Sequence, residues 1–237
     1  LANKGLMANA ELHTAVAELK LPLRFIHSTS ELPPEHHAGD GLRLLLSEQP
    51  LDIERLGRRR GRLSVVGLGP GAAEHMTPAV RRALDEAEDL LGYDTYVKMA
   101  GPLRADQCVH PSDNREELQR AAHAFELAAS GRRVVMISSG DPGVFAMAAA
   151  VMEALESPQN ETWHGVELEV LPGVSAALAT AAKAGAPLGH DFCLISLSDN
   201  LKPWAVIEKR LQHAAIADLA MAFHNPISKS RPWQLGR

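Results

Sequence analysis

From residue 62 onward, short apolar runs alternate with longer stretches in which apolar residues recur every three or four positions. The clearest run, Val134 to Ile137, is continuous and rich in β-branched residues, as expected of a strand buried on both faces. Further strands are expected at 63–66, 166–171, 192–197 and 218–223, and the segment 89–93 leads into another. This alternation predicts an α/β fold of open layers with largely parallel sheets.

Helices are expected where the apolar residues have helical spacing. Thr77 and Pro78 open the first one, with threonine as the N-cap and proline in the first turn. Asp113 and Glu116 form a box-like cap for the second helix, which Gly131 ends. Three more helices are expected at 144–155, 174–183 and 203–214, and the segment 185–191 is typical of a hinge between domains.

The first sixty residues differ in pattern from the rest. Apolar spacing predicts a short helix over 10–20, then a short strand at 21–26 and a loop with prolines and glycines at 28–41. The arginine-rich segment 55–62 has no aromatic residue to stack a base, so we interpret it as a solvated boundary rather than a nucleic-acid patch. We therefore divide the chain into an N-terminal extension or linker, an α/β domain, and the start of a second α/β domain, at 1–61, 62–186 and 187–237.

Composition narrows the possible partners. A net charge of −5 and a pI near 6.1 argue against general nucleic-acid binding, yet allow a local basic pocket for an acidic small molecule. No apolar run approaches the roughly 20 residues that a membrane-spanning helix needs. Cys108 and Cys193 lie far apart without a CxxC, and no histidine pair has the i, i+4 spacing of a helical metal site. We expect a cytoplasmic protein with no structural metal, no nucleic acid and no membrane partner.

A glycine-rich loop follows the strand at 63–66. Gly67, Gly69 and Ala72 satisfy the G-x-G-x-x-G/A pattern of dinucleotide-binding folds. In those folds the helix starts within the glycine loop, and Pro78 would then stand about two turns inside it, where proline costs roughly 3 kcal/mol. A helix that begins at Thr77-Pro78 leaves a longer loop instead, so the pattern disfavours a nicotinamide or flavin site.

Three later loops sit where strands end, at the edge of an α/β sheet that usually faces the ligand. They contain Ser139-Gly140-Asp141-Pro142, the segment 171–176, and His224-Asn225-Pro226. Serine, aspartate, glycine and proline also make ordinary helix caps and turns, which is the alternative interpretation of any one of these loops. Three together at corresponding edges favour a binding site.

These loops carry a family resemblance over residues 62–237. GLGPG at 67–71 with MTP at 76–78, SSGDPGVFAMA at 138–148, and LPGVSA at 171–176 resemble signatures of the tetrapyrrole methylase family. The resemblance implies two α/β domains with S-adenosylmethionine (SAM) in the cleft between them and the tetrapyrrole in a trough near the first loop. SLSDNLKPWAVIEKRL at 196–211 and NPISKSRPWQL at 225–235 resemble the branch that methylates a precorrin at C17, with ring contraction, in cobalamin biosynthesis.

The resemblance also implies roles for individual residues. SAM contacts fall on Pro70, Ser139, Gly140, Asp141, Val144, Ser175, Ala176 and Asn225. Asp94 matches a position proposed as a general base in some relatives, although an Asp after Gly-Tyr can also simply cap a turn. Lys98, Arg104 and Arg115 are candidates for binding substrate carboxylates, with an ordinary solvated surface charge as the alternative.

Two departures from the family pattern bear on the expected activity. His224 stands where this branch more often has tyrosine, and the family continues for several strands and helices beyond residue 237, so the second domain is expected to be incomplete. Residues 11–25 faintly resemble the tail of a cobalamin-pathway domain sometimes fused upstream.

Taken with the resemblance, the sequence predicts SAM-dependent C-methylation of a precorrin by a homodimeric enzyme. The alternatives are a methylase of the same fold acting on another substrate, and a fragment that binds SAM without turnover.

Overall fold

The computed structural model describes residues 58–112, 117–156, 161–200, 202–227 and 232–236, together with three short strands, β1 (Arg24–Phe25), β2 (His36–Ala38) and β3 (Arg43–Leu45). Strand β1 pairs antiparallel with β4 (Arg58–Arg59), and β2 pairs antiparallel with β3. The helix expected at 10–20 and the cap at Asp113 and Glu116 lie outside the described residues. No helix in the described ranges is both long and apolar enough to cross a membrane.

The principal sheet has five parallel strands in the order β7-β6-β8-β5-β9. Its strands are β5 (Arg62–Gly67), β6 (Asp89–Tyr93), β7 (Cys108–Ser112), β8 (Arg133–Ser138) and β9 (Glu167–Leu171). The α/β class and the parallel arrangement expected from the sequence are confirmed. Strand β7 is absent from the sequence prediction; it contains Pro111, which is tolerated because β7 lies at the edge of the sheet.

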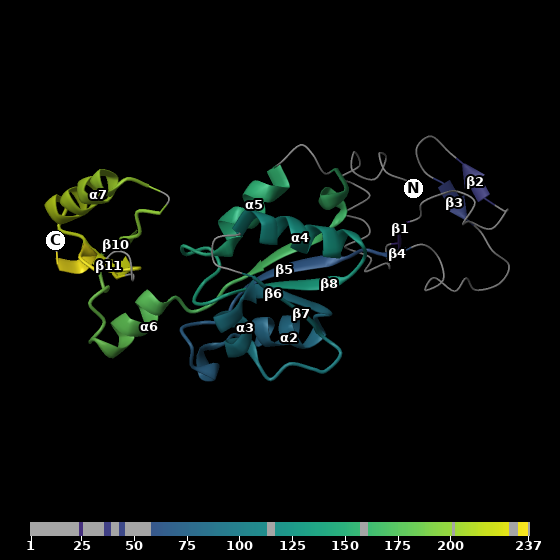
Figure 1. Ribbon diagram of the computed structural model, residues 1–237, viewed down its shortest axis with the longest axis horizontal. Helices are drawn as coiled ribbons and strands as arrows, with labels where there is room; N and C mark the ends of the chain where they lie inside the picture. The colour runs from purple at the N-terminus through teal and green to yellow at the C-terminus, as the bar shows by residue number, and fades with distance from the viewer. Residues whose placement is uncertain are drawn as a thin grey trace.

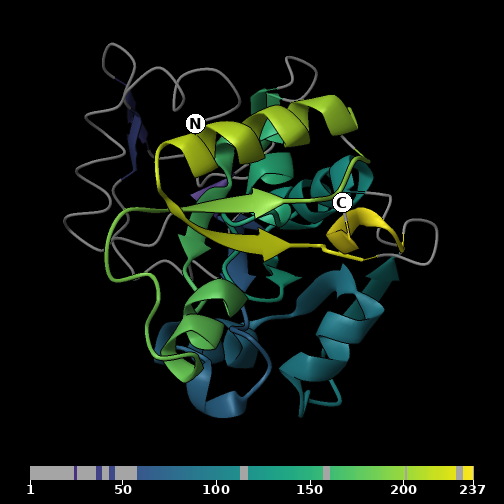
Figure 2. The same cartoon turned by 90° about the vertical axis from the view of Figure 1, so that its left-hand side faces the viewer.

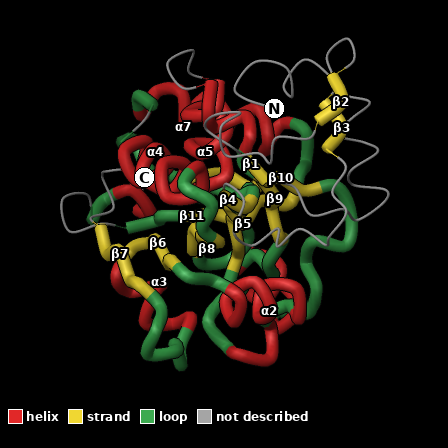
Figure 3. Tube along the Cα trace, turned by 90° about the vertical axis from the view of Figure 1, so that its right-hand side faces the viewer, coloured by secondary structure: helices red, strands yellow, loops and turns green. Residues whose placement is uncertain are grey.

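Helices cover both faces of this sheet (Figures 1 and 3). On one face lie α4 (Glu117–Ala129), α5 (Met147–Glu156) and the 3₁₀ turn Glu161–Gly165, and on the other lie α2 (Pro78–Glu86) and α3 (Asp94–Ala100). Alternate residues of β8 serve the two layers: Val134 and Met136 join the first core, Val135 and Ile137 the second. A strand that is apolar at every position therefore suits the centre of a two-faced sheet.

Two helix boundaries differ from the sequence prediction. As expected, α2 begins at Pro78, and the Thr77 hydroxyl accepts a hydrogen bond from the Val80 amide. The helix expected at 144–155 instead begins at Met147, because the chain first makes a turn in which Phe145 has a left-handed φ of 53°. The next helix, α6 (Ala176–Lys183), begins two residues later than expected, after Ser175 as its N-cap.

The remaining elements form a smaller α/β unit (Figure 2). Strands β10 (Phe192–Ser196) and β11 (Ala220–His224) are parallel, and α7 (Trp204–Ile216) connects them and packs on β10. Ile195 and Ile207 are buried in the core of this unit. The Gln234 amide donates to the Leu197 carbonyl (2.7 Å), so the segment after β11 returns to the end of β10.

Charged side chains tie together the amino ends of the main sheet. The carboxylate of Asp89 is buried and binds Arg132 and the His110 Nε2, the latter at 2.9 Å. Burial of Asp89 would raise its pKa, but hydrogen bonds and charges from Arg132 and His110 outweigh burial, so the pKa of this carboxyl is lowered. Arg59 and Arg60 donate to the carbonyls of Gly131 and Gly165. The described arginines of this segment, interpreted from the sequence as a solvated boundary, are half-exposed and also anchor neighbouring turns.

We expect Asp89→Asn to lower the free energy of unfolding by about 3 kcal/mol near neutral pH, because Arg132 and His110 lose their buried anionic partner. A lowered pKa means that the stabilisation is complete above the unfolded-state value of about 3.9 and is lost as the pH falls through the lower folded-state value. Urea unfolding at neutral and acidic pH measures this difference. Asp85→Asn, at an exposed carboxylate of α2, is the matched control, with an expected change within about 0.5 kcal/mol. An equal loss in both variants at neutral pH would contradict the prediction.

Candidate functional site

Three loops meet at the carboxyl edge of the main sheet. They follow β8, β5 and β9, which are adjacent and parallel, so their ends lie side by side. The first two loops are joined by a pair of backbone hydrogen bonds: the Gly140 amide donates to the Gly69 carbonyl (2.8 Å), and the Gly69 amide donates to the Gly140 carbonyl (3.1 Å). The glycine-rich loop and the SSGDPG loop therefore form one rigid floor.

The third loop packs so tightly on this floor that side chains are excluded. A Cβ on Gly173 would overlap the carbonyl oxygens of both Gly140 and Gly67, and a Cβ on Gly67 would overlap the Gly140 carbonyl oxygen. Gly140 itself has a φ of 63°, in the left-handed region that favours glycine. Contact between backbones therefore excludes a side chain at Gly67 and Gly173, whereas at Gly140 it is the backbone conformation that favours glycine.

Asp141 links the loop after β8 to the loop after β9. Its Oδ1 accepts a hydrogen bond from the Gly143 amide (2.8 Å), and its Oδ2 accepts one from the Gly173 amide (3.1 Å). The sequence analysis expected this carboxylate to bind a ligand. In the structure it braces the loops, and each oxygen retains capacity for a further donor.

The other expected positions of the first unit lie around the same floor. Ser175 is buried and caps α6 through a hydrogen bond from the Ala177 amide, which places Ala176 at the start of that helix. A side chain added at Gly140 would point toward the Ala176 amide nitrogen, at 3.8 Å. Pro70, Ser139 and Val144 are half-buried in the loops after β5 and β8.

Asn225 comes from the smaller unit, directly after β11. It has a φ of 53°, and its side-chain amide donates to the Ser196 hydroxyl (3.1 Å). The preceding residue, His224, packs its ring on that of Phe145, with centroids 5.2 Å apart. Since Phe145 follows Val144 in the loop after β8, this ring contact links the end of β11 to that loop at the main sheet's carboxyl edge.

Asp94 lies at the same edge, at the end of strand β6 beside β8. It is the first residue of α3, after β6, and its exposed carboxylate forms an i, i+4 ion pair with Lys98. Of the other basic candidates, Arg104 binds Asp106 and the Ala87 carbonyl, and Arg115 lies outside the described residues. Lys98 and Arg104 thus both have acidic partners within the chain.

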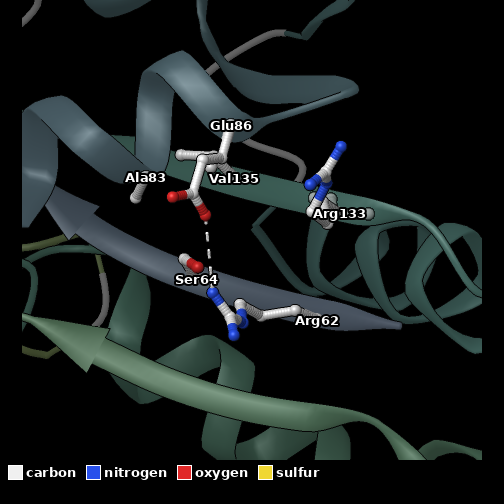
Figure 4. A pocket seen from close by; sticks show the side chains of 7 residues that line it. Arg62, Ser64, Ala83, Glu86, Arg133 and Val135 are labelled. Atoms are coloured by element: carbon white, nitrogen blue, oxygen red, sulfur yellow. Dashed lines mark ion pairs between the residues drawn. The ribbon is translucent and has the colours of Figure 1, made fainter. Parts of the chain in front are cut away.

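A small hollow at the other end of the sheet contains none of the expected site residues (Figure 4). It lies beside the amino-terminal halves of β5 and β8, where Arg62 and Glu86 form an ion pair with a nitrogen–oxygen distance of 3.7 Å. The bridged loops at the carboxyl edge therefore remain the candidate site.

Comparison with known proteins identifies the family of this chain. The model for tetrapyrrole (corrin/porphyrin) methylases matches residues 62–231, well over half of the sequence. The chain belongs to this family. The solved structure of the methyltransferase CobJ is 60% identical, with a TM-score of 0.69, and the match covers 73% of this chain and 72% of that one. The resemblance drawn from the loop motifs and the tetrapyrrole methylase fold are thus confirmed.

Two curated relatives show how far the similarity of this methylase extends. A precorrin-3B C(17)-methyltransferase of a Sinorhizobium species is 58% identical over 176 residues, which cover 74% of this chain and 68% of that protein. The cobalamin biosynthesis protein CobIJ of Mycobacterium bovis is 53% identical over 184 residues, covering 76% of this chain but only 35% of that protein.

Sequence reasoning about the methylase missed the aromatic contact at its site. It placed Phe145 inside a helix, whereas the structure places it in a turn with left-handed backbone, where its ring meets that of His224. The signal available was indirect: the loop SSGDPG contains a proline and two glycines, which favour a longer turn before the helix.

We expect Gly173→Ala to lower the free energy of unfolding of this methylase by about 1–3 kcal/mol, because the added methyl group overlaps two backbone carbonyls that cannot move independently. Gly189→Ala is the matched control: its Cβ would lie 3.7 Å from the Ala186 carbonyl oxygen, an ordinary contact. Urea unfolding of the two variants beside the parent protein measures the difference. Equal stability of the two variants would show that the loops separate without penalty.

Proposed function

We propose that this chain catalyses SAM-dependent methylation of a precorrin at C17, with contraction of the macrocycle, in cobalamin biosynthesis. The observation that carries the proposal is the bridged floor of three glycine loops, in a chain that is 58% identical to a precorrin-3B C(17)-methyltransferase. Cytoplasmic location and a homodimeric state remain expectations of the same proposal.

The residues at the carboxyl edge fit SAM as the methyl donor. Without a side chain, Gly140 leaves its backbone open to a ligand beside the amino end of α6, and partial positive charge at a helix amino end suits a carboxylate. Ser139 offers a hydroxyl, and Asn225 offers a side-chain carbonyl oxygen while its amide is held by Ser196. These groups would hold the amino-acid and ribose parts of the donor, and Val144 would pack on its adenine.

SAM supplies an electrophilic methyl group attached to a sulfonium. The task of the chain is to align that group with an electron-rich ring carbon and to keep water out. Orientation of this kind is worth about 7–11 kcal/mol in well-ordered systems. A floor whose loops are fixed by backbone hydrogen bonds and by Asp141 is suited to this task, because little reorganisation remains when the reactants arrive.

The relatives bear two kinds of name with respect to metal in the substrate. Those named for precorrin-3B reach 58% identity, whereas the cobalt-factor III methyltransferase of Priestia megaterium is 46% identical over 176 residues. The higher identity favours a metal-free precorrin as the substrate.

Methyl transfer tests the proposal directly. We expect the chain, incubated with SAM and precorrin-3B, to release S-adenosylhomocysteine and a product that gains one methyl group, as followed by mass spectrometry. Cobalt-factor III in a parallel reaction is expected to react more slowly. SAM binding by calorimetry without turnover on either ring would favour a binding fragment, and turnover only on another tetrapyrrole would redirect the assignment within the family.

Replacement of Asp94 tests its proposed role as a general base. If its carboxylate accepts a proton from the macrocycle, we expect Asp94→Asn to reduce kcat by about 100-fold or more while the Kd for SAM stays unchanged. Lys98→Met serves as the control, because it breaks the same exposed ion pair and leaves the carboxylate in place. Similar kcat values in both variants would show that Asp94 has only a structural role in the first turn of α3.

A further inference from the structure

The ring contact between Phe145 and His224 joins the two α/β units next to the proposed SAM contacts. Phe145 follows Val144 in the loop after β8, and His224 precedes Asn225 at the end of β11. The centroids lie 5.2 Å apart and the planes are inclined by 59°, which is within the range of favourable aromatic pairs. Any change in this contact therefore moves residues expected to hold the donor from both sides.

The backbone of Phe145 is unusual for an aromatic residue. Its φ of 53° lies in the left-handed region, which a bulky side chain rarely adopts. Its side chain is also 53% exposed, so burial in the core of the main sheet does not explain the conformation. A strained residue of this kind persists where the surroundings require its position, and here the ring is directed to the second unit.

His224 presents a complementary feature. Its Nε2 is buried and makes no hydrogen bond within the described part of the chain. Burial lowers the pKa of this imidazole, and it is the sole cause of the shift. A buried nitrogen without an acceptor is compatible with a neutral ring, whereas a protonated ring would have to regain water or a partner.

We propose that Phe145 and His224 form an aromatic latch that holds the two units together over the methyl donor, and that His224 closes it as the neutral imidazole. The inference rests on the proposed function, because the donor is SAM. His224 acts here as a positioning residue: it sets the place of Asn225 relative to Val144. A tyrosine at this position would supply a ring that does not titrate near neutral pH, so the histidine gives this contact a dependence on pH that a tyrosine would not have.

Charged groups on the surrounding elements do not account for the lowered pKa of His224. The titratable residues on the surrounding elements include Asp141 in the loop before Phe145, Asp199 and Lys202 in the loop after β10, Cys193 on β10, Lys183 on α6 and Asp218 before β11. None of them exerts a charge effect on the pKa of His224. A favourable interaction of a protonated imidazole with the Phe145 ring is the competing possibility, and it predicts the opposite dependence on pH.

The first experiment examines the latch without ligand. Proton NMR titration of the histidine side chains, with the His224 signal assigned by its loss in His224→Phe, gives the pKa of this ring. We expect it to lie below the ordinary histidine value of about 6.5 in the parent protein, and to rise toward that value in Phe145→Ala. An unchanged value in Phe145→Ala would overturn the contact as the origin of burial.

The second experiment measures SAM binding by calorimetry on the same chain. Near neutral pH, Phe145→Ala and His224→Ala are expected to bind SAM about threefold to tenfold more weakly, while His224→Phe restores the affinity because it keeps a ring. Phe192→Ala is the matched control, since Phe192 is exposed at the opposite end of β10. Equal affinity of Phe145→Ala and Phe192→Ala would contradict the latch.

The dependence on pH distinguishes a positioning role from a merely structural one. When the latch is open, the His224 ring is expected to have the ordinary histidine pKa of about 6.5, and below that pH it must lose a proton before the latch closes. The SAM affinity of the parent protein should therefore fall up to about tenfold between about pH 7.5 and about pH 5.5. His224→Phe has no titrating ring at this position, so the part of the pH dependence that comes from His224 should disappear. Any remaining change of SAM affinity with pH in this variant comes from SAM itself or from other groups. Affinity in the parent protein that rises in acid relative to His224→Phe would overturn the neutral state. No SAM binding by the parent protein at any pH would overturn both the proposed donor and the latch's role in binding it, and the NMR titration would still decide whether the ring contact exists.

Discussion

The bridge between Gly69 and Gly140 is the constraint on which the proposed site depends. Two parallel strands end beside each other, and their loops exchange a pair of backbone hydrogen bonds instead of diverging. The third loop then fits only because Gly173 lacks a side chain, and Asp141 fixes it by accepting from its amide. The resulting surface is made mainly of backbone, which allows a small molecule to approach closely and leaves specificity to the side chains at the rim.

The two ends of the main sheet have different tasks. At the amino ends, buried Asp89 and half-exposed arginines tie strands and turns together, so stability there depends on charge pairs. At the carboxyl ends, glycines and the Asp141 carboxylate fix the three bridged loops, whose described residues form no ion pair, while the Asp94–Lys98 pair lies on the neighbouring helix α3. This division follows from parallel strands, which collect every strand-to-helix loop at one edge of the sheet.

Much of the fold could be predicted because local and tertiary signals agree. The apolar run of β8 and the Thr77-Pro78 cap each have one favourable interpretation, and the structure confirms both. Strand β7 and helix α3 could not be found in this way: the strand is short and contains Pro111, and the seven-residue helix depends on packing of Val97 and Ala100 for its place. Whether such short elements form depends on burial against the rest of the fold, and the local sequence pattern carries no information about that burial.

The site was predictable in its parts, whereas its closure was not. Motifs placed Ser139, Asp141 and Asn225 on loops, and parallel strand order then explains why the loop of Ser139 and Asp141 meets the loops after β5 and β9. The proline and glycines of SSGDPG favour a turn before the helix, but nothing in the local sequence indicates that Phe145 reaches the ring of His224, since that contact arises only when two units with separate cores come together. The contact between the two units contributes much less free energy than either hydrophobic core. A ligand or a proton can therefore shift the equilibrium of this contact without unfolding either unit.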